Sequence, residues 1–157
     1  SAMFSACHGE TYNCPVEISE RRYGVMVNQL RLNCNKNGAG RYRGGKGILV
    51  EYQILSPQAW VTASFTRHSA PPWGLNKGNS GSVNAIRIIK RDGTRSTHST
   101  VSHYPLETGD VIQIITANGA GWGDPRQRPV EKIKTDIKNQ FITKEQAIQQ
   151  YDHIDQL

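Results

Sequence analysis

Residues 38–47 read GAGRYRGGKG, so that glycines alternate with three cations, Arg41, Arg43 and Lys46. Strand-like sequence flanks this stretch, with YGVMVNQLRLN at residues 23–33 and ILVEYQIL at residues 48–55. Glycine at this density lets a backbone turn tightly and approach a ligand or a neighbouring chain closely. The stretch therefore predicts a strand-to-strand connection whose three cations are candidates for a substrate pocket or a subunit interface.

The same stretch matches a phosphate-binding P-loop at Gly40, Gly45 and Lys46, but Gly47 replaces the Ser or Thr that normally holds magnesium. A P-loop also runs from a strand into a helix, whose N-terminus meets the phosphate. Residues 48–55 read as a strand instead, so the sequence argues against a P-loop. The dinucleotide-binding glycine pattern fails as well, because Arg43 stands where its third glycine belongs.

Further strands are expected on both sides of this connection. Residues 23–33 alternate with one slip near Asn28 and Gln29, which predicts a bulge. Residues 60–66 (WVTASFT), 84–90 and 110–117 (DVIQIITA) also read as strands. Asp92-Gly93 predicts a hairpin that returns through residues 95–99, with residues 101–104 as its extension. A short helical turn is expected at residues 15–22.

Two irregular loops carry the remaining candidate site residues. Residues 67–82 (RHSAPPWGLNKGNSGS) form a long loop in which Arg67, His68 and Trp73 either line a pocket or belong to a surface loop anchored by Trp73 in a groove. Residues 118–125 (NGAGWGDP) form a second glycine loop. Its Asp124 either anchors a turn or caps the following helix, or it serves as a carboxylate in a pocket.

The pattern changes to a helical one at Pro129, which is expected at the first position of a helix. Val130, Ile133, Ile137 and Phe141 recur at helical spacing, and Thr143 with Gln146 predicts a capping box for a second helix over residues 144–151. Ala147, Ile148 and Tyr151 are expected to face inward. The fold class predicted is mainly β: an antiparallel β-sandwich or barrel-like domain of about six to nine strands, closed by two short C-terminal helices and α+β overall.

The composition argues against two kinds of partner, nucleic acid and membranes. The chain has 157 residues, a net charge of +6 and a pI near 9.4, but its cations are spread out and no nucleic-acid signature accompanies them. No apolar run approaches the ~20 residues that span a bilayer. Neither nucleic acid nor a membrane is therefore an expected partner.

Residues 1–3 read as a cloning scar before a single domain at residues 4–157, and no signal peptide is recognised.

Cysteine and histidine do not form a metal-binding pattern. Cys7, His8, Cys14 and Cys34 have metal-ligand chemistry, but their spacing matches no zinc module. We therefore predict no metal site and no nucleophile–base pair in them. The odd count of three cysteines argues against a disulfide framework and for a reducing compartment, so the cytoplasm is expected.

Six stretches in order resemble the hydantoinase B/oxoprolinase family. They are residues 9–17 (GETYNCPVE), 20–23 (ERRY), 38–47 (GAGRYRGGKG), 71–75 (PPWGL), 108–111 (TGDV) and 119–125 (GAGWGDP). Each stretch alone is weak, but their order and spacing agree with the family over nearly the whole chain. One departure is Ala120, where the family's second loop has a further glycine.

The resemblance implies that residues 4–157 are the C-terminal domain of a longer protein. Such proteins hydrolyse a cyclic amide, a hydantoin or 5-oxoproline, in an ATP-dependent assembly with a hydantoinase A-like subunit or domain. ATP and a divalent metal ion are implied for the full assembly and none for this domain, which is expected to be inactive alone, with its catalytic residues unknown. The alternatives are a non-catalytic assembly module and a part of an acetone- or acetophenone-type carboxylase.

Overall fold

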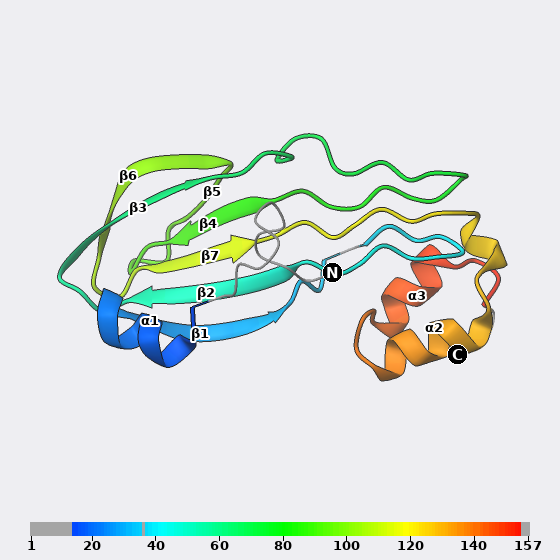
Figure 1. Ribbon diagram of the computed structural model, residues 1–157, viewed down its shortest axis with the longest axis horizontal. Helices are drawn as coiled ribbons and strands as arrows, with labels where there is room; N and C mark the ends of the chain where they lie inside the picture. Colours follow the sequence, from blue (N-terminus) through cyan, green and yellow to red (C-terminus); the bar gives the residue numbers. More distant parts are fainter. Residues whose placement is uncertain (1–13, 36, 155–157) are drawn as a thin grey trace.

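The computed structural model describes residues 14–35 and 37–154, which form two antiparallel sheets and three short α-helices (Figure 1). The strands are β1 (Val25–Leu32), β2 (Ile48–Ile54), β3 (Gln58–Ser64), β4 (Ala85–Ile89), β5 (Arg95–His98), β6 (Thr100–Glu107) and β7 (Val111–Ile115). The helices are α1 (Val16–Tyr23), the 3₁₀ turn η1 (Pro125–Gln127), α2 (Val130–Lys138) and α3 (Lys144–Gln150). No helix in this part of the chain is long and apolar enough to cross a membrane.

The larger sheet has the strand order β1-β2-β7-β4-β5, with every neighbouring pair antiparallel. The predicted bulge in β1 is confirmed, because the register with β2 shifts between Val27 and Gln29. The helical turn before it is confirmed as α1, which ends at Gly24 in a left-handed conformation, with φ of 58°.

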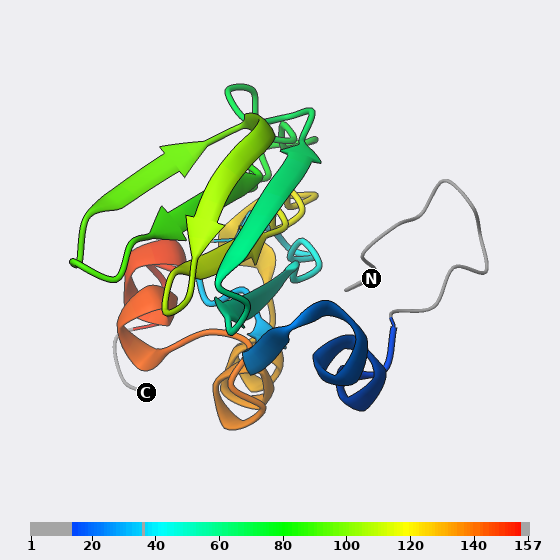
Figure 2. The same ribbon diagram turned by 90° about the vertical axis from the view of Figure 1, so that its left-hand side faces the viewer.

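The second sheet is the pair β3–β6, which lies across one face of the larger sheet (Figure 2). Apolar side chains of both sheets form the core between them: Ile54, Ile86, Ile88, Val101, Leu106 and Ile112. The sandwich is therefore confirmed, and the sheets do not close into a barrel. The expectation that residues 101–104 extend β5 is wrong, because β6 pairs with β3 and this pairing turns Val101 and Leu106 into the core.

Three extended segments continue beyond the ends of the sheet, on the side opposite α1 (Figure 1). They are residues 38–47, 72–82 and 118–124, and together we call them the glycine layer. Residues 38–47 connect β1 to β2, and Ile48 starts a strand where a P-loop would start a helix. The structure thus agrees with the sequence argument against a P-loop.

Backbone hydrogen bonds join the three segments into one layer. The amides of Tyr42 and Trp122 each donate to the other's carbonyl at 2.9 Å. The amide of Asn79 donates to the carbonyl of Ala39 at 2.8 Å, and the amide of Gly121 donates to the carbonyl of Asn79 at 2.9 Å. Because each segment bonds to its neighbours, these irregular stretches have the paired amides and carbonyls of a sheet.

The segments approach so closely that side chains do not fit between them. A Cβ added to Gly121 would collide with the carbonyl of Ala39, and one added to Gly44 would collide with the carbonyl of Gly119. Glycine is required at both positions because the obstructing atoms are backbone, which cannot move aside as a flexible side chain can.

The C-terminal helices form a second core against the glycine layer. Ala39 is fully buried there with Ile133, Ala147 and Tyr151, and the predicted capping box of Thr143 is present. Two expectations are wrong in detail. Pro129 is the residue before α2 rather than its first, and Ile148 is 55% exposed, because it lies on the solvent side of α3.

The close approach predicts that Gly121→Ala destabilises the domain by about 1–3 kcal/mol, since the added methyl group overpacks a rigid backbone contact. Gly119→Ala is the matched control in the same segment, where the nearest atom to an added Cβ is the Gly45 amide nitrogen at 3.2 Å. The free energy of unfolding is measured by urea titration. Equal stabilities for the two variants would contradict the close-packed layer.

Candidate functional site

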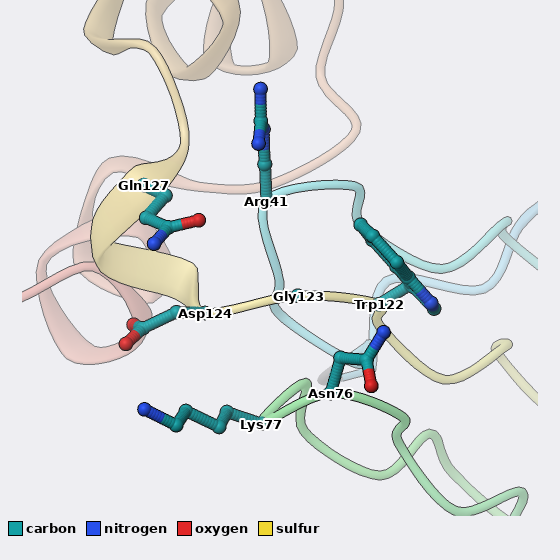
Figure 3. A pocket seen from close by; sticks show the side chains of 7 residues that line it. All are labelled: Arg41, Asn76, Lys77, Trp122, Gly123, Asp124 and Gln127. Atoms are coloured by element: carbon teal, nitrogen blue, oxygen red, sulfur yellow. The ribbon is translucent and has the colours of Figure 1, made fainter.

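The candidate site is a pocket of about 310 Å³ at the open edge of the glycine layer (Figure 3). All three segments of the layer and η1 contribute to it. Figure 3 shows Lys77 and Asp124 extending toward the same side of the pocket, with the ring of Trp122 at the other side. The lining residues are Arg41, Asn76, Lys77, Trp122, Gly123, Asp124 and Gln127.

Two cations give the pocket a positive character. The side chains of Arg41 and Lys77 form no ion pair with any carboxylate in the described part of the chain. Asn76 and Lys77 both adopt left-handed backbone conformations, with φ of 48° and 71°. Such conformations cost of order 1 kcal/mol each for residues other than glycine, and they are common where a chain is shaped around a binding site.

Asp124 is held by local contacts. Its carboxylate accepts hydrogen bonds from the Arg126 backbone amide at 3.0 Å, from Arg126 Nε at 3.1 Å and from Arg126 Nη2 at 2.7 Å. The side-chain hydrogen bond from Arg126 is the largest cause that lowers the pKa of Asp124 to about 2. The carboxylate is therefore ionised near neutral pH, so it can bind and orient a ligand but has no proton to give as a general acid.

Arg43 points to the opposite side of the layer, toward α2. Its Nε lies 3.0 Å from Asp136 Oδ2, and Arg128 Nη2 lies 2.6 Å from the same oxygen. Arg128 also donates from Nη1 to the carbonyl of Arg41 at 3.1 Å, and the guanidinium of Arg43 lies 4.5 Å from the ring centre of Phe141. This buried cluster fastens the glycine layer to the C-terminal helices.

Lys46 is also turned inward. It is buried, and its Nζ donates to the carbonyl of Asn35 at 3.2 Å. Burial is the largest cause that lowers the pKa of the Lys46 ammonium, and the charge of Arg43 lowers it further, whereas Cys34 and Asp136 act in the opposite direction. The structure thus separates Lys46 and Arg43 from Arg41, although the three cations are close in sequence.

Arg67, His68 and Trp73 lie in the exposed loop between β3 and β4. The guanidinium of Arg67 lies 5.5 Å from the ring centre of Trp73, a cation–π contact, and Arg67 has a left-handed φ of 53°. Trp73 is 67% exposed, so the alternative that it anchors the loop in a groove is wrong. A binding role for the three residues stays a prediction.

Metal-ligand side chains do not converge in the part of the chain that the structure describes. Cys14 and Cys34 are exposed free thiols, and no group of three or more His, Cys, Asp or Glu side chains that could hold a metal ion occurs among the described residues. Cys7 and His8 lie outside them. The donor set of these residues therefore does not fit a divalent metal ion.

Sequence reasoning found two of the pocket residues, Arg41 and Asp124, and missed the side chains of Asn76, Lys77, Trp122 and Gln127. The missed residues lie in or beside the two irregular loops at residues 67–82 and 118–125. Their convergence depends on the pairing of the three segments, which no spacing in the sequence reveals. The one available signal was that both loops are irregular and contain several glycines.

The Asp124–Arg126 contact predicts a measurable pH dependence. A carboxyl whose pKa is lower in the folded state stabilises the fold above its ordinary pKa of 3.8, and this contribution is lost as the pH falls toward about 2. We expect an NMR titration of the Asp124 carboxyl carbon to have its midpoint near 2. Arg126→Ala raises the midpoint toward 3.8, whereas Arg95→Ala, on the distant β5, leaves it unchanged; a wild-type midpoint near 3.8 refutes the contact.

The buried cluster around Asp136 predicts a second effect. Asp136→Asn leaves the guanidinium groups of Arg43 and Arg128 without a carboxylate, and breaking a buried pair in this way costs about 3–5 kcal/mol. Glu131→Gln on the same helix is the control, because its ion pair with Lys134 is exposed and worth less than about 1 kcal/mol. Urea unfolding of both variants measures the difference, and a loss below 1 kcal/mol for Asp136→Asn would contradict the structural role.

Three comparisons place this chain among known proteins. It is 30% identical over 146 residues to the B-type subunit of a putative D-/L-hydantoinase from a Pseudomonas species, covering 92% of this chain and 24% of that protein. Its fold matches the ATP-dependent caprolactamase of Pseudomonas jessenii with a TM-score of 0.69 at 24% identity, covering 85% of this chain and 24% of that one. It matches nucleotide-free acetone carboxylase with a TM-score of 0.72 at 17% identity, covering 88% and 22%.

The chain spans about a quarter of the length of these proteins. The two structural likenesses, both below 25% identity, support the fold described above. A family model described as Hydantoinase B/oxoprolinase matches residues 1–125. The resemblance that the glycine loops suggested is thus confirmed, and the chain belongs to the hydantoinase B/oxoprolinase family.

Proposed function

We propose that this chain is the C-terminal domain of a longer protein that hydrolyses a cyclic amide, a hydantoin or 5-oxoproline, in an ATP-dependent assembly. The observation that carries the proposal is the match to the family, together with the alignment of 92% of the chain to one subunit of a putative hydantoinase. The caprolactamase, an ATP-dependent enzyme with a related fold, supports the same class of reaction.

The pocket suits a binding role within that reaction. Arg41 and Lys77 offer positive charge, Asn76 and Gln127 offer amide donors and acceptors, and Trp122 offers an apolar ring. These are groups that hold and orient a polar ring or an anion. In our proposal they form one wall of a binding site, and the catalytic residues lie in the part of the parent protein outside this chain.

ATP has a clear chemical use in opening such a ring. The amide bond of a lactam or hydantoin is stabilised by resonance, so its carbonyl carbon is a weak electrophile. ATP, where the assembly binds it, supplies the phosphoryl group that activates the carbonyl oxygen. Because the described residues do not fit a metal ion, we propose that ATP and its divalent metal ion bind elsewhere in the assembly.

The partners follow from the same proposal. A hydantoinase A-like subunit or domain would handle the nucleotide, and the remaining N-terminal part of the same chain would complete the site. The Pseudomonas relative is named as one subunit of its enzyme, which supports the need for a partner. The exposed free thiols of Cys14 and Cys34 support a reducing, cytoplasmic setting for the assembly.

A second candidate is carboxylation of a small ketone. The fold match to acetone carboxylase, with its TM-score of 0.72, favours it as much as the caprolactamase match favours ring opening. The two reactions are distinguished by their co-substrate. Carboxylation consumes bicarbonate and a ketone, whereas ring opening consumes water and the cyclic amide.

The proposal predicts where activity is found. The full parent protein with its A-like partner is expected to open 5-oxoproline or a hydantoin and to release ADP, and this 157-residue chain alone is expected to do neither. Product is measured by chromatography and ADP by a coupled assay. Ring opening by the isolated chain, or turnover of ketone and bicarbonate in place of the cyclic amides, would contradict the proposal.

Variants of the pocket test its role in the parent assembly. Arg41→Ala and Asp124→Asn are expected to lower kcat/KM by about 10-fold or more, which corresponds to a lost interaction of about 1.4 kcal/mol, with subunit association intact. Arg95→Ala, on β5, is the control. If the pocket variants instead abolish association and leave the turnover of the residual complex unchanged, the domain is a non-catalytic assembly module.

A further inference from the structure

Three large apolar side chains form a row on the surface of the glycine layer. Tyr42 is 54% exposed, Leu75 56% and Trp122 44%. Backbone bridges pair Trp122 with Tyr42 on one side and with Leu75 on the other. Directly paired residues of adjacent extended segments project to the same side, and the ring centres of Tyr42 and Trp122 lie 5.6 Å apart. We call these three residues the apolar row.

The apolar row stands on closely packed backbone. Gly121, next to Trp122, lies against the Ala39 carbonyl with no room for a Cβ, so the segments that carry the row cannot come closer together. Contiguous exposed apolar side chains on a rigid support mark interaction sites. Tyrosine and tryptophan, with arginine close by, are also the residues that contribute most to protein interfaces.

The charges at the edge of the row indicate the chemistry of its partner. Trp122 shares the pocket with Arg41 and Lys77. Neither cation forms an ion pair with a carboxylate among the residues that the structure describes, and, after the side-chain hydrogen bond from Arg126, the charge of Lys77 is one of the causes that lower the pKa of Asp124. The nearby carboxylate of Asp124 is already paired with Arg126. A complementary surface would therefore present carboxylates around an apolar centre.

We propose that the apolar row docks onto another part of the same parent chain, whose carboxylates face Arg41 and Lys77 where these cations border the row. The pocket beyond them, toward Asp124 and Gln127, stays open to the ligand of the proposed function. The inference rests on the part of the proposed function that makes this chain a piece of a longer protein, and it does not depend on the reaction catalysed. It assigns to the row a role in joining domains.

Two arguments favour the same chain over other occupants. The chain spans 24% of the putative hydantoinase protein that it matches, so a parent of that length brings about three times as much sequence on one polypeptide. A covalent link raises the effective concentration of that surface to the millimolar range, which fills even a small apolar face. A second copy is disfavoured, because a two-fold contact must place carboxylates of this same surface opposite Arg41 and Lys77, and the nearby Asp124 is already paired with Arg126.

The experiment uses the fluorescence of Trp122 alone. The chain has three tryptophans, so Trp60→Phe with Trp73→Phe leaves Trp122 as its single emitter. The tryptophans in the rest of the parent and in the A-like partner are replaced by Phe as well, so that Trp122 is the single emitter in every sample. Acrylamide quenching is measured in this 157-residue chain, in the full-length parent alone, and in the parent with its A-like partner. We expect ready quenching in the short chain and a quenching constant lower by about threefold or more in the parent alone, since an interface core excludes water.

Charge reversal tests the edge of the same surface. Arg41→Glu with Lys77→Glu in the full-length parent is expected to raise the quenching of Trp122 toward that of the short chain, whereas the control Arg95→Glu leaves it unchanged. Three outcomes overturn the proposal: equal quenching in the short chain and the parent, shielding that begins only when the A-like partner is added, and shielding that increases with protein concentration as for a second copy. Each is independent of whether the assembly opens a ring.

Discussion

The contact between backbones inside the glycine layer is the constraint on which the rest of the structure depends. Where a Cβ on Gly121 would overlap the Ala39 carbonyl, only hydrogen atoms separate the two segments. This proximity lets three stretches without strand geometry satisfy each other's amides and carbonyls. A layer of this kind is rigid without a hydrophobic core of its own, and it extends the sandwich without adding side-chain volume.

The two sides of the glycine layer make different contacts: one packs against the C-terminal helices, and the other is open to solvent. On one side Ala39 packs into the core of α2 and α3, and the cluster of Arg43, Asp136 and Arg128 fixes that attachment. At the open edge the same segments present Arg41 and Trp122 to solvent. Arg41 and Arg43, two residues apart in one segment, thus point to opposite sides of the glycine layer. The attachment to α2 and α3 on one side holds the candidate site on the other side in place.

Much of this could be predicted from the sequence, and the limits have physical causes. Alternation in residues 23–33, the Thr143 capping box and the strand after Gly47 are local features, and each was found where it was expected. The pairing of β6 with β3 depends on contacts distant in sequence, so it was missed. For the same reason the sequence suggested Arg41 and Asp124 but not Lys77, whose place in the pocket is set by two other segments.

The most direct test of this account is backbone hydrogen exchange of the glycine layer followed by NMR. We predict that the amides of Tyr42, Asn79 and Trp122, which donate across the layer at 2.8–2.9 Å, exchange as slowly as amides in the centre of β2 and β7. Exchange at the rate of an unstructured peptide, with the sheet still protected, would show that these segments are independent loops and would contradict the account.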